Sequence, residues 1–152
     1  MKKAVSLLSV IVLCLTLLAG CGSSNANLSE VMSKINTDFN LSLKTLENVD
    51  DLNTYYSIDT ADVKQFAAEI NSNSNAPQEI VLVEAVDADA ASRVEQALTN
   101  RYNSIYGTFK SYSPEQVSVV EGSKVTKDGN FVSMIVAENS ADMLKVYYEF
   151  VK

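Results

Sequence analysis

The sequence predicts an α+β domain, with about four strands in an antiparallel or mixed sheet, a long central helix, and further helices at its N- and C-terminal ends. Three observations carry this prediction: apolar residues at helical spacing in several segments, a short β-branched run between them, and an Asp-Gly pair inside a late apolar stretch. Runs of helix and strand that do not alternate regularly are typical of this class.

The first 20 residues are expected to be a signal peptide and not part of the fold. Lys2 and Lys3 precede an apolar run at positions 4–18, and the small residues Ala19 and Gly20 follow it. The run is shorter than the ~18 to 20 residues that a helix needs to cross a bilayer. A signal that is removed is therefore predicted in place of a permanent span.

Cys21 stands directly after these small residues, and the segment from Leu18 to Cys21 matches a lipobox. In a lipobox the thiol accepts a diacylglycerol before cleavage, which supplies the two chains that stable anchoring takes. The alternative is an ordinary cleavage site followed by a chance cysteine. We expect a mature protein lipid-anchored through Cys21 at the outer face of the cell membrane, with residues 21–27 as a flexible tether.

The mature chain is expected to be one acidic domain over residues 28–152. Losing residues 1–20 leaves 10 basic against 19 acidic side chains, a formal charge of −9. This charge repels nucleic acid and anionic lipid head groups, so neither is an expected partner. Cys14 is lost with the signal and Cys21 is acylated, which leaves no thiol for a disulfide, a nucleophile or a metal.

An amphipathic helix is predicted at the start of the domain. Its apolar residues recur three and four positions apart: Leu28, Val31, Met32, Ile35 and Phe39. We expect this face to pack on the core, and a partner-binding or oligomer face is the alternative. The apolar residues at 41, 43, 46 and 49 follow a less regular spacing, and the acidic pair at 50 and 51 is expected to end the segment.

Two periodicities compete at residues 63–70. Positions 63, 66, 67 and 70 fit a helix, whereas 66, 68 and 70 alternate as in a strand, and we favour the strand. Residues 71–78 are polar and small and are expected to form a loop. The apolar residues at 80–83, 85 and 86 are rich in β-branched side chains and are typical of a central strand covered on both faces.

The longest helix is predicted after this strand. Asp87 or Asp89 can cap its start by accepting backbone N–H bonds. Apolar residues at helical spacing follow: Val94, Leu98, Tyr102, Ile105 and Phe109. Pro114, capped by Ser113, is then expected to begin a short helix that runs towards Val120.

A β-hairpin and a closing helix are predicted for the last 30 residues or so. Asp128 and Gly129 are expected at the centre of a type I′ turn, because both central positions need a positive φ. Asn139 is expected to cap the final helix, in which Leu144 and Tyr147 share one side with further apolar residues.

Most catalytic and cofactor chemistry lacks its residues in this sequence. There is no histidine, no mature serine is followed three positions later by lysine, and the glycines after Cys21 are too dispersed for a phosphate loop. Asp87 and Asp89 lack the further ligands of a calcium loop. We expect no catalytic residue, no cofactor and no metal, although carboxylate-dependent hydrolysis stays open because 19 acidic residues offer many pairs.

Short motifs carry a family resemblance. They lie at residues 56–59, at Arg101 within the long helix, and in the Tyr-x-Pro-x-Gln segment of Tyr112, Pro114 and Gln116. On these motifs the chain resembles a domain-of-unknown-function family of small lipoproteins from Gram-positive bacteria. The resemblance implies an extracytoplasmic α+β domain with a strand near Phe66, and it implies no reaction, substrate or cofactor.

Arg101, Tyr112 and Gln116 are the candidate binding residues. Guanidinium and amide donors can meet an anionic group or a peptide backbone. The alternative is structural: Arg101 pairs with a carboxylate and ties the long helix to the following loop. We expect a non-catalytic binding or accessory module with a possible envelope protein partner; the alternatives are a carboxylate-dependent hydrolase of cell-envelope polymers and a spacer or assembly protein.

Overall fold

The computed structural model describes residues 26–73 and 75–152, so the predicted signal peptide and the predicted lipidation site, Cys21, lie outside the described residues. The elements follow in this order: α2 (Leu28–Phe39), β1 (Lys44–Leu46), α3 (Val49–Tyr56), η2 (Thr60–Asp62), β2 (Val63–Ile70), β3 (Glu79–Ala85), α4 (Ala88–Tyr112), η3 (Pro114–Gln116), α5 (Val117–Glu121), β4 (Lys124–Asp128), β5 (Phe131–Val136) and α6 (Ser140–Val151).

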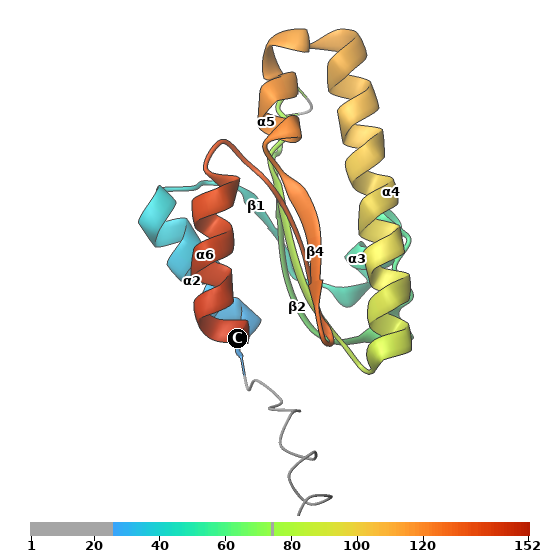
Figure 1. Cartoon of the computed structure of the whole chain (residues 1–152). Coiled ribbons are helices and arrows are strands. Elements are labelled where there is room, and N and C mark those ends of the chain that lie inside the picture. The colour runs from blue at the N-terminus through green and yellow to red at the C-terminus, as the bar shows by residue number, and fades with distance from the viewer. Residues whose placement is uncertain (1–25, 74) are drawn as a thin grey trace, which may run out of the picture.

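The strands form one antiparallel sheet in the order β1-β2-β3-β5-β4. Helices α2 and α6 cover one face of the sheet, and α3 and α4 cover the other (Figure 1). The predicted α+β class is therefore confirmed. The sheet has five strands where about four were expected, and the additional strand is the short β1.

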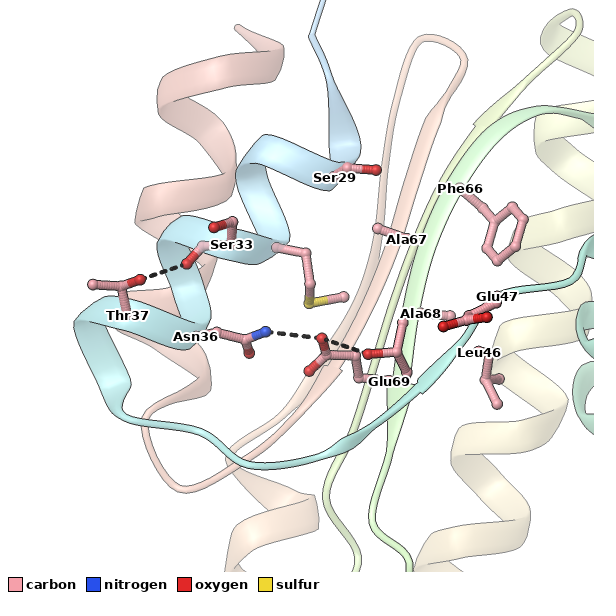
Figure 2. Close-up of a pocket in the computed structure, with 12 residues that line it drawn as sticks. Ser29, Ser33, Asn36, Thr37, Leu46, Glu47, Phe66, Ala67, Ala68 and Glu69 are labelled. Carbon is pink, nitrogen blue, oxygen red and sulfur yellow. Dashed lines mark hydrogen bonds between the residues drawn. The ribbon is translucent and has the colours of Figure 1, made fainter.

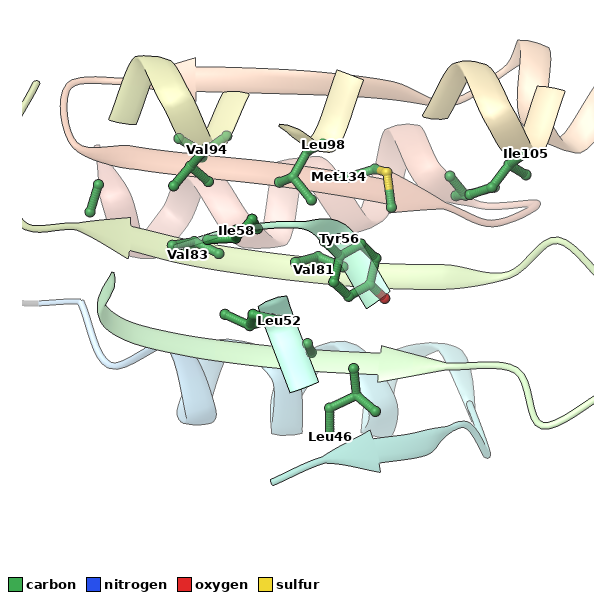
Figure 3. Packing of buried hydrophobic residues seen from close by; sticks show 14 of the residues in the cluster. Leu46, Leu52, Tyr56, Ile58, Val81, Val83, Val94, Leu98, Ile105 and Met134 are labelled. Carbon is green, nitrogen blue, oxygen red and sulfur yellow. The ribbon is translucent and has the colours of Figure 1, made fainter. Parts of the chain in front are cut away.

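Strand β3 lies at the centre of the sheet, and all seven of its residues are buried. Val81 and Val83 pack with Leu98 of α4 in the core shown in Figure 3, whereas Ile80 and Leu82 pack on the opposite face with α2 and α6. Because both faces are covered, the middle of the strand, residues 80–83, is an unbroken apolar run. The prediction of a central strand here is confirmed.

Several local predictions are confirmed. Helix α2 spans the predicted residues and buries the predicted face against the core. Residues 63–70 form a strand and not a helix. Asp87 caps α4, accepting from the backbone N–H of Ala90 at 2.8 Å. The helices expected after Ser113 and Asn139 also form, although neither side chain makes a capping hydrogen bond.

The prediction that the acidic pair at 50 and 51 ends a segment is wrong, because both residues lie in the first turn of α3. Asn48 caps this helix by accepting from the backbone N–H of Asp50, and Asp51 accepts from the backbone N–H of Asn48. Carboxylates near a helix N-terminus interact favourably with its dipole. An acidic pair after asparagine was thus the start signal of a helix.

The hairpin is confirmed, but its turn is displaced by one residue from the prediction. Asp128 pairs with Phe131 as the last residue of β4, so Gly129 and Asn130 form the turn. Of these two turn residues, only Gly129 has a positive φ, +57°, which fits glycine at the first central position of a type II′ turn.

Strand β1 leaves part of the sheet edge uncovered. It pairs only with Ala68, Glu69 and Ile70, the last three of the eight residues of β2. Among the described residues, no strand lies beside Val63–Ala67 on the side away from β3.

None of the helices in the described ranges combines the length and apolar character needed to span a bilayer.

Candidate functional site

A groove of about 610 Å³ lies between α2 and the sheet edge formed by β1 and β2 (Figure 2). Its lining residues come from these three elements and from the residue after β1: Ser29, Met32, Ser33, Asn36, Thr37, Thr45, Leu46, Glu47, Phe66, Ala67, Ala68 and Glu69. Volumes of this order are typical of small-ligand sites.

Helix α2 supplies one wall because of its residue spacing. Ser29, Ser33, Asn36 and Thr37 recur three and four positions apart, so they form a polar stripe on one side of the helix. This stripe borders the apolar face that packs on the core, and Met32 lies between the two. The helix is therefore anchored by one face and lines the groove with the next.

Glu69 lies where the three elements meet. Thr45 of β1 is its cross-strand partner, and the Thr45 hydroxyl donates to Glu69 Oε1 at 3.4 Å. Asn36 of α2 donates to the same oxygen through Nδ2 at 2.8 Å, and Figure 2 shows the two side chains pointing toward each other. The Glu69 residue is only 5% exposed.

Two oxygens at this junction have no hydrogen-bond partner: Glu69 Oε2 and Asn36 Oδ1 are both buried and unpaired. Turning the Asn36 amide over would place its oxygen against the Glu69 carboxylate, so the observed orientation is the favourable one. Buried acceptors without a donor cost free energy, and a charged one costs more than a neutral one. The pair is therefore predisposed to accept hydrogen bonds.

Glu69 differs from the other buried carboxylates of the described residues, which each have a cation. Asp62 pairs with Arg93 at 2.6 Å and Glu84 with Lys64 at 2.7 Å, and Glu79 pairs with Arg101. No ion pair is formed by Glu69 in the ranges that the structure describes. A buried carboxylate is ordinarily matched by an opposite charge, and here that charge is missing.

The missing cation beside Glu69 indicates which ligand groups suit the groove. Glu47 and Glu69 are the charged members of its lining, and both are acidic. An ammonium or guanidinium group has several donors and no acceptor, so it suits a junction at which Glu69 Oε2 and Asn36 Oδ1 both lack donors. Across the described residues, no group of three potential metal ligands comes together.

The three residues nominated from sequence do not form one site. Arg101 and Tyr112 lie in the same helix eleven positions apart, which separates them by roughly 16 Å along its axis. Tyr112 is 84% exposed, and Gln116 donates to the backbone oxygen of Asn75 at 2.7 Å. The structure therefore places Arg101, Tyr112 and Gln116 in separate surroundings.

Arg101 takes the structural role that was the alternative. Its Nε donates to Glu79 Oε2 at 3.0 Å and its Nη2 to Oε1, so it ties α4 to β3 and not to the loop after α4. Hydrogen bonding to Glu79 raises the pKa of the Arg101 guanidinium. A second cavity of about 360 Å³ lies beside Arg101 and Tyr56. Its two arginines, Arg93 and Arg101, are each already paired with a carboxylate.

Sequence reasoning missed Glu69, and only a weak signal pointed to it. Within the strand at 63–70, Ala67 and Glu69 share the face that packs towards α2. A glutamate on a covered strand face needs a partner, whereas the strand prediction rests on the apolar residues at 66, 68 and 70. Asn36 and Thr45 lie far from it in sequence, and folding brings them to it.

Comparison with known proteins gives one result for this chain. A family model described as Domain of unknown function (DUF4358) matches residues 35–137. No curated protein matches, and no solved structure matches. The matched region contains Asn36, Thr45 and Glu69 together with the whole sheet. Since the match takes in more than half of the chain, the protein belongs to the family described as Domain of unknown function (DUF4358).

Proposed function

We propose that this protein is a non-catalytic binding module, lipid-anchored at the outer face of the cell membrane, whose groove between α2, β1 and β2 binds a positively charged, hydrogen-bond-donating group. The observation that carries the proposal is Glu69, a buried carboxylate in the groove wall with one unpaired oxygen and no cation. The ligand supplies the charge that the described chain does not.

The ligand group we favour is an ammonium or a guanidinium. Hydrogen bonds to a charged partner contribute about 1.5–3 kcal/mol each, which corresponds to roughly tenfold or more in affinity. Serine and threonine hydroxyls of α2 offer further donors and acceptors along the groove. Leu46, Phe66 and Met32 add apolar contact for the stem that carries the charge.

Anchoring at a membrane is supported by the sequence alone. Leu18 to Cys21 match a lipobox after a charged and an apolar region. We propose the Gram-positive lipoprotein type from the family resemblance of the motifs at residues 56–59, at Arg101 and in the Tyr-x-Pro-x-Gln segment. An acidic domain gains nothing from anionic head groups, so lipid on Cys21 is the proposed means of attachment. A ligand at the envelope, including a protein partner, would then be within reach of the tethered groove.

Chemical-shift titration of the full-length protein in detergent micelles tests the ligand chemistry. The probes are Nα-acetyl-lysine amide and Nα-acetyl-norleucine amide, which differ in the ammonium group. We expect saturable shifts at the amides of Asn36, Thr45 and Glu69 with the lysine probe only. Glu69→Gln should weaken this binding about tenfold or more. The exposed control Glu115→Gln removes the same charge outside the groove and should leave binding unchanged.

Saturable binding elsewhere on the surface, or equal binding of both probes, would count against the proposal. Turnover of peptidoglycan fragments that disappears in both Glu47→Gln and Glu69→Gln would replace it with the hydrolase alternative, because these two residues are the carboxylates of the groove.

A further inference from the structure

Phe66 and Ala67, at the end of the uncovered part of β2, line the same groove as the Glu69 carboxylate, which has no cation. We propose that the ligand is an extended peptide segment carrying lysine or arginine, which pairs with β2 as an added strand where β1 ends. This inference rests on the proposed function of the groove as a ligand site and specifies its substrate class. The occupant is a basic peptide and not a second copy of this acidic chain.

The sheet edge provides the backbone part of the argument. β1 pairs with Ala68–Ile70 only, whereas β3 pairs with β2 along its whole length. Five residues, Val63–Ala67, therefore have no strand on their outer side within the described chain. At about 3.3 Å per residue this edge is roughly 17 Å long, enough for a short extended segment. Exposed edges of this kind recruit peptides by main-chain hydrogen bonding.

The groove continues this edge in the direction that an added strand would follow. Phe66 and Ala67 of the uncovered stretch line it on one side, and the stripe of Ser29, Ser33 and Thr37 lines it on the other. Figure 2 shows lining side chains of α2 on one side of the groove and those of β2 on the other. A strand placed beside β2 is flanked by α2, so its side chains on that face meet hydroxyl groups.

The register provides the charge part of the argument. β1 ends with Leu46 opposite Ala68 and Glu47 follows it, so an added strand pairs with β2 only as far as Phe66. The next peptide residue then enters the groove beside Ala67, on the α2 face that Ala67 and Glu69 share. Glu69 lies two residues further along β2, a distance that a lysine or arginine side chain spans. The cationic end reaches the Glu69 and Asn36 oxygens that lack donors.

Charge also selects the occupant. The charged lining residues, Glu47 and Glu69, are both acidic, and the expected mature chain has a formal charge of −9. A second copy of the chain would bring like charge to the groove, whereas a basic peptide brings the opposite charge. Complementary charge therefore favours a basic peptide over self-association.

Selection from a random heptapeptide phage library on the full-length protein in detergent tests the inference. We expect enriched peptides to carry lysine or arginine and to lose at least tenfold in affinity with Glu69→Gln. Ser33→Phe provides a second variant: the residue is exposed on α2, so the change fills the groove while the carboxylate stays. It should abolish peptide binding, and Glu115→Gln should not change it.

Backbone methylation then separates strand addition from side-chain recognition. The best peptide is made in two forms with N-methyl groups on alternate residues, in one register or the other. A strand beside β2 has every second N–H directed at it, so one form should lose at least tenfold in affinity and the other less than threefold. Equal losses in both forms, peptides without basic residues, or binding that survives Ser33→Phe would overturn the inference.

Failure here and failure of the proposed function give different results. If Nα-acetyl-lysine amide binds at Glu69 but no peptide is enriched above the Glu69→Gln background, the groove takes a small cation and the peptide inference is overturned. If Nα-acetyl-lysine amide does not bind at Glu69 either, the proposed function fails as well.

Discussion

Glu69 and Glu79 are both glutamates on the sheet with about the same burial, 5% and 8% exposed, yet their surroundings oppose each other. Arg101 forms two hydrogen bonds to Glu79, whereas Glu69 receives only neutral donors from Asn36 and Thr45. A buried charge with a matched cation is tolerated, and one without is a net cost to folding. Binding sites often retain such costs because the ligand relieves them.

Glu69→Gln is therefore predicted to stabilise the free protein. The substitution removes an uncompensated charge and adds an amide donor to a junction at which Asn36 Oδ1 has no partner. We expect the free energy of unfolding to rise by about 1 kcal/mol. Urea unfolding of the full-length protein followed by circular dichroism measures this change.

Glu79→Gln is the matched control and should act in the opposite direction. It leaves the Arg101 guanidinium without its carboxylate, although the Arg101 side chain is 34% exposed and can be partly rehydrated. We expect a loss of about 1–3 kcal/mol. Equal destabilisation by both substitutions would mean that Glu69 is as well compensated as Glu79.

At the scale of elements, the short helix α3 depends on its cap. Its eight residues are too few for a stable helix in isolation, so packing of Leu52 and Tyr56 and the Asn48 cap must hold it. α3 follows β1 directly, and thus determines where the edge strand ends and the groove opens.

Asn48→Ala should lower the free energy of unfolding by about 1 kcal/mol, because the N-terminal N–H groups of α3 lose their acceptor. Asn103→Ala makes the same change at an exposed position inside α4, where alanine favours the helix, and should be neutral or slightly stabilising. Thermal unfolding of the two variants compares them, and equal midpoints would contradict the capping role.

The ion pair between η2 and α4 should give the fold a dependence on acid pH. Hydrogen bonds from Arg93, at 2.6 and 2.9 Å, hold the pKa of the Asp62 carboxyl below its usual range. A lowered pKa in the folded state stabilises the fold above the unfolded value of about 3.9, and this contribution is lost as the pH falls through the folded pKa.

Asp62→Asn should therefore be less stable than the native protein at pH 6, and the difference should shrink as the pH falls below about 4. Urea unfolding between pH 6 and pH 3 measures this difference, with Glu115→Gln as the exposed control. A constant difference across the range would show that Asp62 acts through packing and not through its charge.

At the scale of the whole molecule, helices cover both faces of the sheet, while part of one edge stays open. Helices α2 and α6 cover one face, and α3 and α4 cover the other (Figure 1). The groove lies between α2 and the edge formed by β1 and β2. The chain enters the described domain at the start of α2, one wall of the groove. A lipid on Cys21 would thus hold the groove close to the membrane.

Cys21→Ala is predicted to release the protein from the membrane, because the acidic domain has no attraction for anionic lipid. Cell fractionation with immunoblotting measures the distribution, and mass spectrometry of the native chain measures the added diacylglycerol. A substituted protein that stays in the membrane fraction after a high-salt wash would contradict lipid anchoring as the means of attachment.

Much of the fold was predictable because its signals are local. The spacing in Leu28–Phe39, the β-branched run of β3 and the Asp87 cap each act over a few residues, and the structure has these elements as predicted. β1 and α3 were missed: three strand residues are too few to show a period, and Asn48 is a start signal that its acidic neighbours obscured. The Gly129 turn was displaced because Asp-Gly and Gly-Asn both fit two-residue turns.

By itself, the sequence determined the class of the fold, the position of most of its elements, the acidic charge and the lipobox pattern, since each depends on residue type and short-range spacing. Only the tertiary structure decided the candidate site. Asn36, Thr45 and Glu69 come from three elements, and the missing cation beside Glu69 becomes visible only when the neighbours of every buried carboxylate are known. Burial and pairing are properties of the packed chain, and no short-range pattern of residues encodes them.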